Sequence, residues 1–157
     1  MNIFVLDEDP QLCAQYHCNK HVVKMILETT QLLNNALSNN ANYNPCYKVT
    51  HKNHPASIWA MESFDNFNWL LKLGLSLCQE YSFRYEKIHK CEQLLNQFDK
   101  TNFQAILPRV GLTTFRLCMP EKYHSNDAVK SYRDYYLNDK RHIAFWKKRE
   151  IPYWFPQ

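Results

Sequence analysis

The sequence has only two glycines in 157 residues, Gly74 and Gly111, well below the ~7% of an average protein. Tight hairpins and phosphate-binding loops depend on glycine because it adopts positive φ angles without steric cost. This shortage argues against a β-sandwich and against a P-loop or Rossmann nucleotide site. We therefore predict a mainly α fold.

Cysteine motifs, a leader and long apolar runs are also missing. The six cysteines form no CxxC pair and no zinc-ribbon spacing, so we expect free thiols in a reducing cytoplasm. The opening MNIFVL is short and has no basic leader, and we expect no signal peptide. No apolar run approaches the ~20 residues that a bilayer requires, so we expect no membrane partner.

What the chain does contain is typical of a globular protein. Hydrophobic residues make up 45% and aromatic residues 15%, enough for a stable core in one domain spanning residues 1–157. The net charge of +4 permits an anionic partner. From Glu121 onward, eight Lys or Arg residues stand against five Asp or Glu residues, so the end of the chain is net basic.

The hydrophobic pattern predicts a single compact helical domain with a short extended N-terminal arm and an irregular, aromatic-rich C-terminal tail. MNIFVL is either an edge strand or an arm threaded into the core. Asp9 and Pro10 begin a helix that runs to about Ser38 or restarts at Asn19. Residues 39–53 form a polar loop and residues 99–124 are irregular. Further helices are predicted over residues 55–81, 83–98 and 125–137, with a short one in 140–148. In the first, the predicted buried stripe is Trp59, Phe67, Leu70, Leu71, Gly74, Leu77, Cys78 and Tyr81. In the second, the residues expected to point inward are Tyr85, Ile88, Cys91, Leu95 and Phe98, and Ser125 is expected to cap the third.

The stretch HCNKHVVKMILETTQLL carries an unusual polar wedge. At ~100° per residue, its polar positions cover roughly 100° of the helix, and they are His17, Lys20, His21, Lys24, Glu28 and Gln31. Apolar residues, Val23 and Leu27 among them, fill most of the remaining circumference, so we predict a helix buried on several sides with its wedge facing a cleft. There a desolvated lysine is a usable nucleophile, while a histidine or carboxylate transfers protons. The alternative is a solvated stripe with Lys24–Glu28 as a weak ion pair.

Two histidines in HKNHP lie at a loop-to-helix junction, where backbone N–H groups attract anions. His51 and His54 would bind phosphate, ligate metal or cap the helix, and capping is favoured. We group them with His17, Gln31 and Arg84 as candidate ligand- or phosphate-binding residues. The spacing of His17 and His21 also suits a metal, but a zincin-like site has a glutamate after its first histidine and here residue 18 is cysteine. We predict no metal and no cofactor.

The C-terminal third interleaves cations with aromatic residues, as in proteins that neutralise phosphates and stack on bases. The alternative is that the aromatic residues belong to the core and the cations form its solvated edge, which is favoured for Phe145 and Trp146. The candidate nucleic-acid-binding residues are Arg133, Lys140, Arg141, Lys147, Lys148, Arg149 and Trp154.

The order of these features resembles that of the small all-helical pyrimidine-dimer DNA glycosylases of the endonuclease V type, found in bacteriophages and large viruses. The shared features are an apolar arm, a helix with a charged wedge, NHP before a long aromatic helix, and a basic-aromatic end. The strings NKHVVKMILE and NHPASIW also resemble small phage proteins without an assigned function. The resemblance implies DNA binding and, for a virus-encoded protein, the host cytoplasm.

In that family the attacking group is the α-amine of a small residue exposed by loss of the initiator methionine, assisted by a glutamate on the first helix. This sequence departs at both places. Asn2 is bulky, so the free amine would belong to Met1. Lys20 and His21 stand near the expected glutamate, and the next carboxylate is Glu28, two turns on. If the family's chemistry is retained, we expect Lys20 or Lys24 to attack C1′ of the nucleotide, with His21 or Glu28 transferring protons. The departure is equally consistent with a different reaction in an inherited pocket.

The first functional hypothesis is a base-excision glycosylase and abasic-site lyase that works through a lysine imine. The second is a non-catalytic binder of a nucleotide or phosphorylated ligand, such as a viral accessory or counter-defence protein. The third is a metal-dependent hydrolase. The sequence leaves open whether the protein is an enzyme at all, and it does not indicate an oligomeric state.

Overall fold

Asp9 and Pro10 begin the first helix, as the sequence predicts. In the computed structural model, which describes residues 1–156, α1 spans Pro10–Tyr16. Asp9 Oδ1 accepts hydrogen bonds from the backbone N–H groups of Gln11 (2.8 Å) and Leu12 (2.9 Å). Pro10 has no N–H that needs a partner there, so the pair fixes the start of the helix.

The helix breaks after Tyr16 and restarts as α2, Asn19–Leu37. His17 is extended, with φ −63° and ψ 131°, and the last carbonyls of α1 lack intrahelical donors. The guanidinium of Arg84 supplies them, donating to the Gln15 carbonyl at 2.9 Å and the His17 carbonyl at 2.8 Å. The restart alternative is therefore confirmed, with Lys20 and His21 in the first turn of α2.

The predicted long helix over residues 55–81 is two helices, α3 (Pro55–Glu62) and α4 (Phe64–Tyr85). Ser63 separates them, because its Oγ accepts from the Asp65 N–H at 3.0 Å and donates to the Gly111 carbonyl at 2.6 Å. The prediction of one unbroken helix was wrong at this residue. Its buried stripe is confirmed for Trp59, Phe67, Leu70, Leu71, Gly74, Leu77 and Cys78, whereas Tyr81 is half-buried.

The helix predicted over residues 83–98 lies later in the chain, as α5 (Glu92–Lys100). Residues 83–85 belong to α4, which ends at Glu86 in the left-handed region with φ 56°. Ile88 was expected to point inward but is 79% exposed. Leu95 and Phe98 are buried as predicted.

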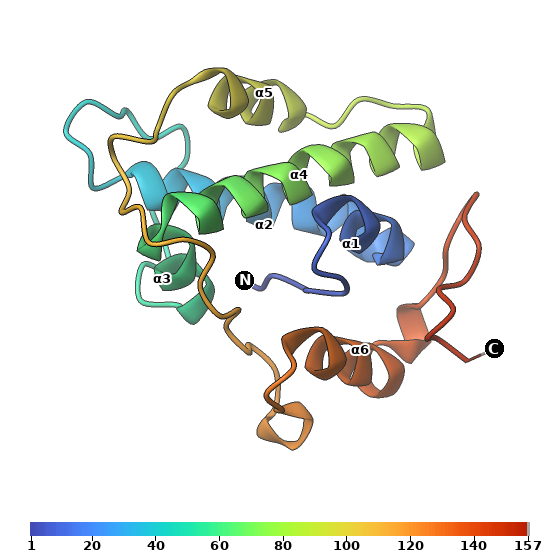
Figure 1. The fold of residues 1–157 in the computed structure, drawn as a ribbon. Helices are drawn as coiled ribbons and strands as arrows, with labels where there is room; N and C mark the ends of the chain where they lie inside the picture. Colours follow the sequence, from blue (N-terminus) through green and yellow to red (C-terminus); the bar gives the residue numbers. More distant parts are fainter. Residues whose placement is uncertain (157) are drawn as a thin grey trace.

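Helix α4 lies at the centre, with α1 and α2 against one side and α5 against the other (Figure 1). Gly74 allows this close approach of three helices. A Cβ atom there would lie 2.9 Å from Thr29 Cγ2 and 3.2 Å from Leu95 Cδ2, closer than packed side chains tolerate. No helix within residues 1–156 is both long enough and apolar enough to cross a bilayer.

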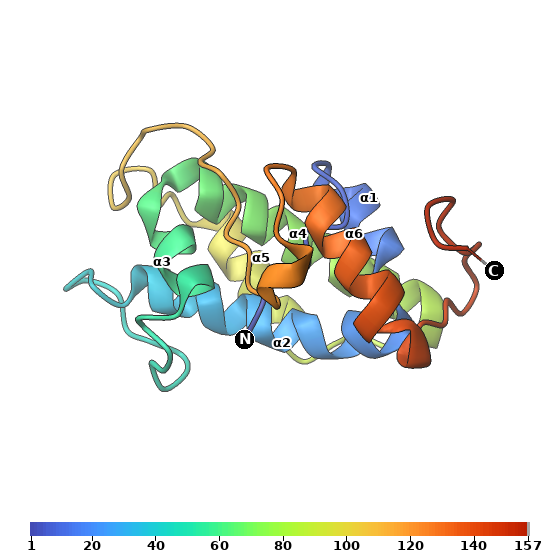
Figure 2. The same ribbon diagram turned by 90° about the horizontal axis from the view of Figure 1, so that it is seen from below.

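The N-terminal arm is threaded into the core, and residues 1–156 contain no strand. Residues 3–6 are buried. The Phe4 ring stacks on His21, with centroids 4.3 Å apart, and its other neighbours include Tyr135 and Tyr136 of α6, Ala128–Asp139. Figure 2 shows the start of the chain beside α2 and the segment that leads to α6. The edge-strand alternative is thereby excluded.

The C-terminal third is mostly irregular apart from α6, Ala128–Asp139. Asp127 caps α6 by accepting from the Lys130 N–H at 2.9 Å, in place of the predicted Ser125. The short helix predicted in 140–148 is a single 3₁₀ turn, Arg141–Ile143, and another turn spans Glu121–Tyr123. Trp146 is buried as predicted, but Phe145 is 67% exposed. The predicted mainly α single domain with an extended arm and an irregular aromatic tail is confirmed.

Candidate active site

The amino terminus of the chain lies against Glu28. The Met1 nitrogen is 4.0 Å from Glu28 Oε2, and the Asn2 N–H donates to the same oxygen at 3.0 Å. Both side chains are shielded, with 6% of Met1 and 14% of Glu28 exposed. The arm thus holds a primary amine beside the one carboxylate of α2, which is also the only Asp or Glu between residues 10 and 61.

Lys24 approaches the other oxygen of Glu28, with Nζ 3.4 Å from Oε1, and its side chain is 70% exposed. Two amines therefore flank one carboxylate, and the helix-spaced ion pair is present as one interpretation predicts. Lys20, one turn earlier, is exposed. We use the name "amine site" for the Met1 amino group, Lys24 and Glu28, together with His54, whose pKa, lowered first by burial, is also affected by both the amino-terminal charge and Glu28.

The predicted wedge does not face an open cleft. Its middle is covered by the arm, since Phe4 lies on His21 and the chain start lies on Glu28. His17 is not part of α2 at all but is the C-cap residue of α1. Val23 and Leu27, expected to be buried, are 42% and 40% exposed. Helical spacing alone could not show that the chain's own start would cover the middle of this wedge.

His17 and His21 are buried structural residues in this fold. His17 is fully buried, and its Nδ1 donates to the Cys13 carbonyl at 2.7 Å. His21 is 6% exposed and shares a 2.5 Å hydrogen bond with the Tyr136 hydroxyl. Burial lowers the pKa of His17 to about 4 and, with smaller contributions from His17, Lys140 and Lys24, that of His21 to about 3. Both are neutral near pH 7, and Phe4 separates His21 from solvent.

His54 caps α3, which is the favoured interpretation of HKNHP. Its Nδ1 accepts from the Ala56 N–H at 3.1 Å. Burial is the first cause that lowers the pKa of His54, followed by the amino-terminal charge and His51, while Glu28 raises it. His54 is thus electrostatically coupled to the amine site. His51 is exposed with φ 57°, and Gln31 is half-buried one turn beyond Glu28 on α2.

Arg84 does not reach the amine site, so a phosphate-binding role does not fit its placement. It is fully buried and pairs with Glu80 at 3.0 Å. Its remaining donors go to the Gln15 and His17 carbonyls and to Asn19 Oδ1. These contacts hold the α1–α2 junction against α4, which is a structural role.

The C-terminal cations are largely engaged within the protein. Arg133 donates to the Leu6 carbonyl at 2.9 Å, pairs with Asp7 at 3.2 Å, and lies 5.1 Å from the ring centre of Trp154. Arg149 donates to both oxygens of Glu80, at 2.6 and 3.2 Å. Arg133, Arg149 and Trp154 therefore attach the C-terminal tail to α1, α4 and α6.

The other cations of this region remain more accessible. Arg141, Lys147 and Lys148 are exposed, and Lys140 is half-buried. Each still has a partner: Lys148 pairs with Glu86 at 2.5 Å, Lys147 lies 5.5 Å from the Tyr85 ring centre, and Lys140 lies 4.8 Å from that of Tyr135. Exposed cation–π and ion pairs are weak, so phosphates can compete for these side chains.

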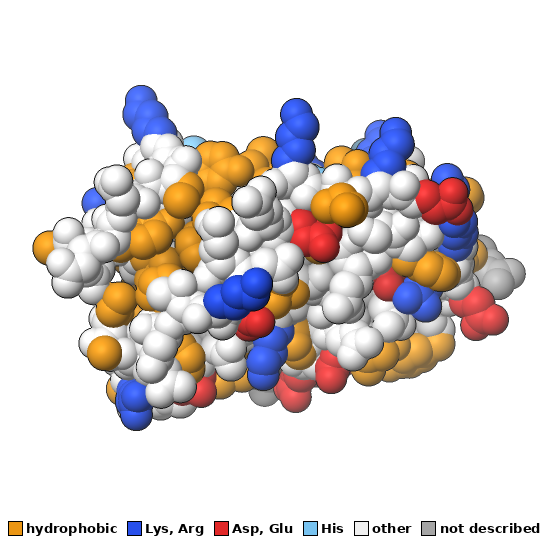
Figure 3. All heavy atoms as spheres, turned by 90° about the horizontal axis from the view of Figure 1, so that it is seen from above, with side chains coloured by type: hydrophobic (Ala, Val, Ile, Leu, Met, Phe, Trp, Pro, Cys, Tyr) orange, Lys and Arg blue, Asp and Glu red, His pale blue; other side chains and the backbone are white. Residues whose placement is uncertain are grey.

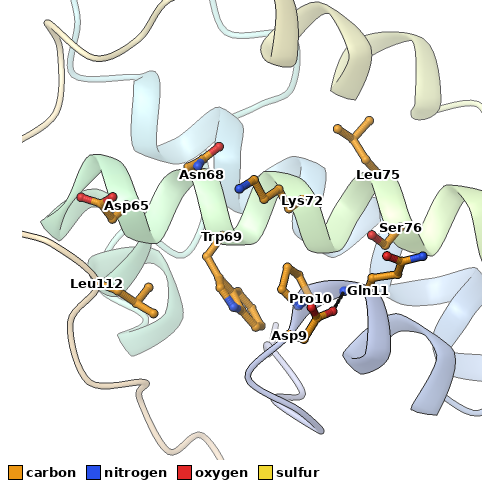
Figure 4. A pocket seen from close by; sticks show the side chains of 10 residues that line it. All are labelled: Asp9, Pro10, Gln11, Asp65, Asn68, Trp69, Lys72, Leu75, Ser76 and Leu112. Carbon is orange, nitrogen blue, oxygen red and sulfur yellow. Dashed lines mark hydrogen bonds between the residues drawn. The ribbon is translucent and has the colours of Figure 1, made fainter.

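A cavity of about 520 Å³ lies between the start of α1 and the first half of α4 (Figure 4). It presents Asp9 and Asp65 against a single cation, Lys72, so its net negative charge would repel a phosphate. Asp9 is committed to capping α1, and Trp69 donates its Nε1–H to the Glu8 carbonyl at 2.7 Å. Neither its charge nor its free groups suit a nucleotide, and none of its lining residues belongs to the amine site.

On the face that carries α5, hydrophobic side chains gather between separate cations (Figure 3). A second cavity here, of about 370 Å³, is lined mainly by Tyr43, Phe98, Phe103 and polar amides of the flanking loops. Phe98 and Phe103 are buried in the core, so their faces are already occupied. Across residues 1–156, no group of three or more His, Cys, Asp or Glu side chains is placed to hold a metal ion.

A family model described as pyrimidine dimer DNA glycosylase matches residues 1–93. No curated protein and no solved structure shows a significant match. The matched region contains the arm, α1 to α4 and every residue of the amine site. The C-terminal segment, with its cations and aromatic residues, lies outside it.

Proposed function

The chain belongs to the pyrimidine dimer DNA glycosylase family, and we propose that it excises altered bases from DNA with its amino-terminal nitrogen as the nucleophile. Family membership supports a DNA glycosylase-type function that acts on nucleic acid. The observation that carries the finer proposal is the 4.0 Å approach of the Met1 nitrogen to Glu28 Oε2. A nucleophile beside a carboxylate that can take up and return protons is the arrangement required for this chemistry.

In the proposed reaction, the lone pair of the amine attacks C1′ of the damaged nucleotide. The bond from C1′ to the base breaks, and the base leaves with its electron pair and takes up a proton. The C1′–O4′ bond then opens to an imine, with a proton delivered to O4′. Loss of a proton from C2′ expels the 3′ phosphate and cleaves the strand. Glu28 is placed to accept the proton that the attacking nitrogen loses and to return it to O4′.

The α-amine is favoured over the lysines on two grounds. Free α-amines lose their proton at a lower pH than lysine ammonium groups do, so a larger fraction is nucleophilic near pH 7. The Met1 side chain is 6% exposed, which fixes the nitrogen, whereas Lys24 is 70% exposed and retains its side-chain freedom. Lys24 is then suited to bind a phosphate beside the reacting sugar. Removal of Met1 would leave a terminal nitrogen on Asn2, which already contacts Glu28 at 3.0 Å.

Borohydride reduction in the presence of abasic-site DNA tests the proposal. We expect a covalent adduct with the unmodified chain and none with a chain that carries two extra residues before Met1, because the added residues displace the amine from Glu28. Lys24→Met is the matched control and should still form the adduct. An adduct that survives the extension but is lost in Lys24→Met would transfer the role to Lys24. No adduct, with thermal stabilisation by mononucleotides only, would favour the non-catalytic binder.

A further inference from the structure

His54 occupies a constrained position at the start of α3. It is the N-cap residue, with φ −69° and ψ 137°, and its ring nitrogen Nδ1 accepts the Ala56 N–H at 3.1 Å. Capping is usually performed by Ser, Thr, Asp or Asn. A histidine in this place also accepts a hydrogen bond from a backbone N–H that has no partner within the helix, and it leaves its second nitrogen, Nε2, free.

The cap determines which nitrogen carries the proton. A neutral imidazole has one donor and one acceptor nitrogen, and Nδ1 must be the acceptor because it faces an N–H. The proton is therefore on Nε2. A second proton on Nδ1 would oppose the Ala56 N–H and the positive end of the helix dipole. Burial, the amino-terminal charge and His51 also lower the pKa of His54, against the opposing effect of Glu28, so the ring stays neutral.

A short series of contacts connects this ring to the amine site. Ala56, whose N–H His54 caps, lines a small cavity together with Ile3 of the arm. Burial raises the pKa of the Cys118 thiol, and the Ala56 backbone acts to lower it. The Cys118 carbonyl accepts from Asn2 Nδ2 at 3.0 Å, and the Asn2 N–H donates to Glu28 at 3.0 Å. The cap of α3, the segment before α6 and the start of the arm are thus connected next to the amine. His54 is half-buried, with part of its ring open to solvent.

We propose that His54 is a further catalytic residue of the amine site, whose neutral Nε2–H donates a hydrogen bond to the base as it leaves C1′. The inference rests on the proposed function. When the bond from C1′ to the base breaks, the electron pair stays on the base and negative charge develops on its nitrogen and carbonyl oxygens. A hydrogen-bond donor held next to that charge by the cap of α3 would stabilise the transition state more than the ground state.

A neutral donor suits this position better than an acid does. An imidazolium would sit beside the amino-terminal charge and compete with it for Glu28. The neutral ring transfers no proton, so it takes no part in the proton transfers that involve Glu28 and the amine. A neutral histidine held at a helix N-terminus is an established way to polarise an oxygen without adding charge.

His54→Asn isolates the donor, because asparagine is among the best N-caps and can accept the Ala56 N–H while losing the Nε2–H. His142→Asn is the matched control, since residue 142 is an exposed histidine outside the amine site. We expect single-turnover excision by H54N to fall about 100-fold. Formation of the borohydride adduct with abasic DNA, which has no base to release, should stay within about twofold. H142N should leave both rates unchanged.

Other outcomes separate the alternatives. Undiminished excision by H54N would overturn the inference. Equal losses of excision and adduct formation would assign His54 to DNA binding or folding and would also overturn it. Failure of the unmodified chain to form any adduct would instead reject the proposed function.

The tautomer provides a second test on the intact protein. Nitrogen-15 spectra of the His54 ring should show protonated Nε2 and unprotonated Nδ1 throughout pH 6 to 8. The ratio of unmodified to H54N excision rates should be constant over that range. A ratio that declines as the pH rises would indicate a proton-donating imidazolium and would overturn the neutral-donor role.

Discussion

The two ends of the chain use their cations in opposite ways. At the C-terminal end, Arg133 and Arg149 are paired with Asp7 and Glu80 and packed on aromatic rings, so most of their charge is consumed in attaching the tail. At the amino-terminal end, two amines share a single carboxylate, Glu28, which leaves one excess positive charge facing the exterior. The cations at the C-terminal end stabilise the fold, whereas the amines at the amino-terminal end remain available to react or to bind a ligand.

The comparison shows why composition alone is a poor guide to function. The C-terminal segment has the basic-aromatic content of a nucleic-acid binder, yet Arg133, Arg149 and Trp154 are occupied within the fold. The segments that form the amine site are not enriched in basic and aromatic residues in this way, and the site is assembled from three separate parts of the chain. Residues 1–93, which match the family, contain this site and not the basic tail.

The largest expected effect is on activity at the amino-terminal end. Glu28→Gln keeps an oxygen for the Asn2 N–H but removes the group that accepts a proton, so excision should fall 10²- to 10⁴-fold. Single-turnover rates on DNA containing a pyrimidine dimer would measure this. Glu121→Gln, a change at an exposed side chain in the 3₁₀ turn before α6, is the control and should have no effect. A rate for E28Q within threefold of the unmodified chain would remove Glu28 from the mechanism.

The second effect is on stability, through the buried Arg84–Glu80 ion pair of α4. Arg84 also holds the α1–α2 junction, and Glu80 also binds Arg149 of the tail. Arg84→Met leaves the α1 carbonyls without donors and removes one partner of Glu80, which should lower the free energy of unfolding by about 3–5 kcal/mol. Urea denaturation measures the loss. Arg109→Met, which alters an exposed side chain, serves as the control. Excision per folded molecule should be retained, because Arg84 does not contact the amine site. A loss below 1 kcal/mol would contradict the structural role.

The third effect is acid sensitivity from His17 and His21. Their pKa values in the fold, about 4 and about 3, lie below the ~6.5 of an unfolded histidine, so the unfolded chain binds more protons in acid. The fold is therefore fully stable above pH 6.5 and loses stability as the pH falls toward 4. Each histidine should contribute a loss of about 2 kcal/mol between pH 7 and pH 5. Urea midpoints at both pH values, with His142→Asn as an exposed control, would measure it. An unchanged midpoint would contradict the buried, neutral assignment.

The smallest effect separates the accessible cations from the engaged ones. Lys147→Ala should lower the slope of log affinity for DNA against log salt concentration by about 0.9, the value for one lost phosphate contact. Arg133→Gln should leave the slope unchanged, since its charge is already paired with Asp7. Affinities measured between 50 and 200 mM salt would decide this. A larger slope change for R133Q than for K147A would reverse the assignment of these residues.

Local signals in the sequence were sufficient for most of the helices. Asp9-Pro10 and the apolar stripe of α4 act within a few residues, and both are confirmed. The restart at Asn19 was one of two alternatives, and in the structure the break before it is held by the distant Arg84. The break at Ser63 was missed because its hydroxyl is held by Gly111, 48 residues away. The burial of Arg84 was missed for the same reason, since its partners beyond Glu80 are 65 to 69 residues distant.

The residues of the amine site were named from the sequence, but their arrangement in space was not predicted. Lys24 and Glu28 were recognised on α2, and His54 was recognised as a cap. The contact between Glu28 and the chain start spans 26 residues and depends on the path of the arm, which helical spacing cannot give. One signal was available: Glu28 is the only carboxylate between residues 10 and 61, so a family that uses a glutamate on its first helices has no other candidate here.

The most direct test of the account identifies the nitrogen that reacts. The borohydride-reduced adduct with abasic DNA would be digested with trypsin, and the modified peptide would be sequenced by mass spectrometry alongside the intact mass of the free protein. We expect the sugar remnant on the α-nitrogen of the first residue present in the mature chain. A remnant on the side chain of Lys20 or Lys24, with a free α-amine, would contradict the central claim that the amino terminus held against Glu28 is the nucleophile.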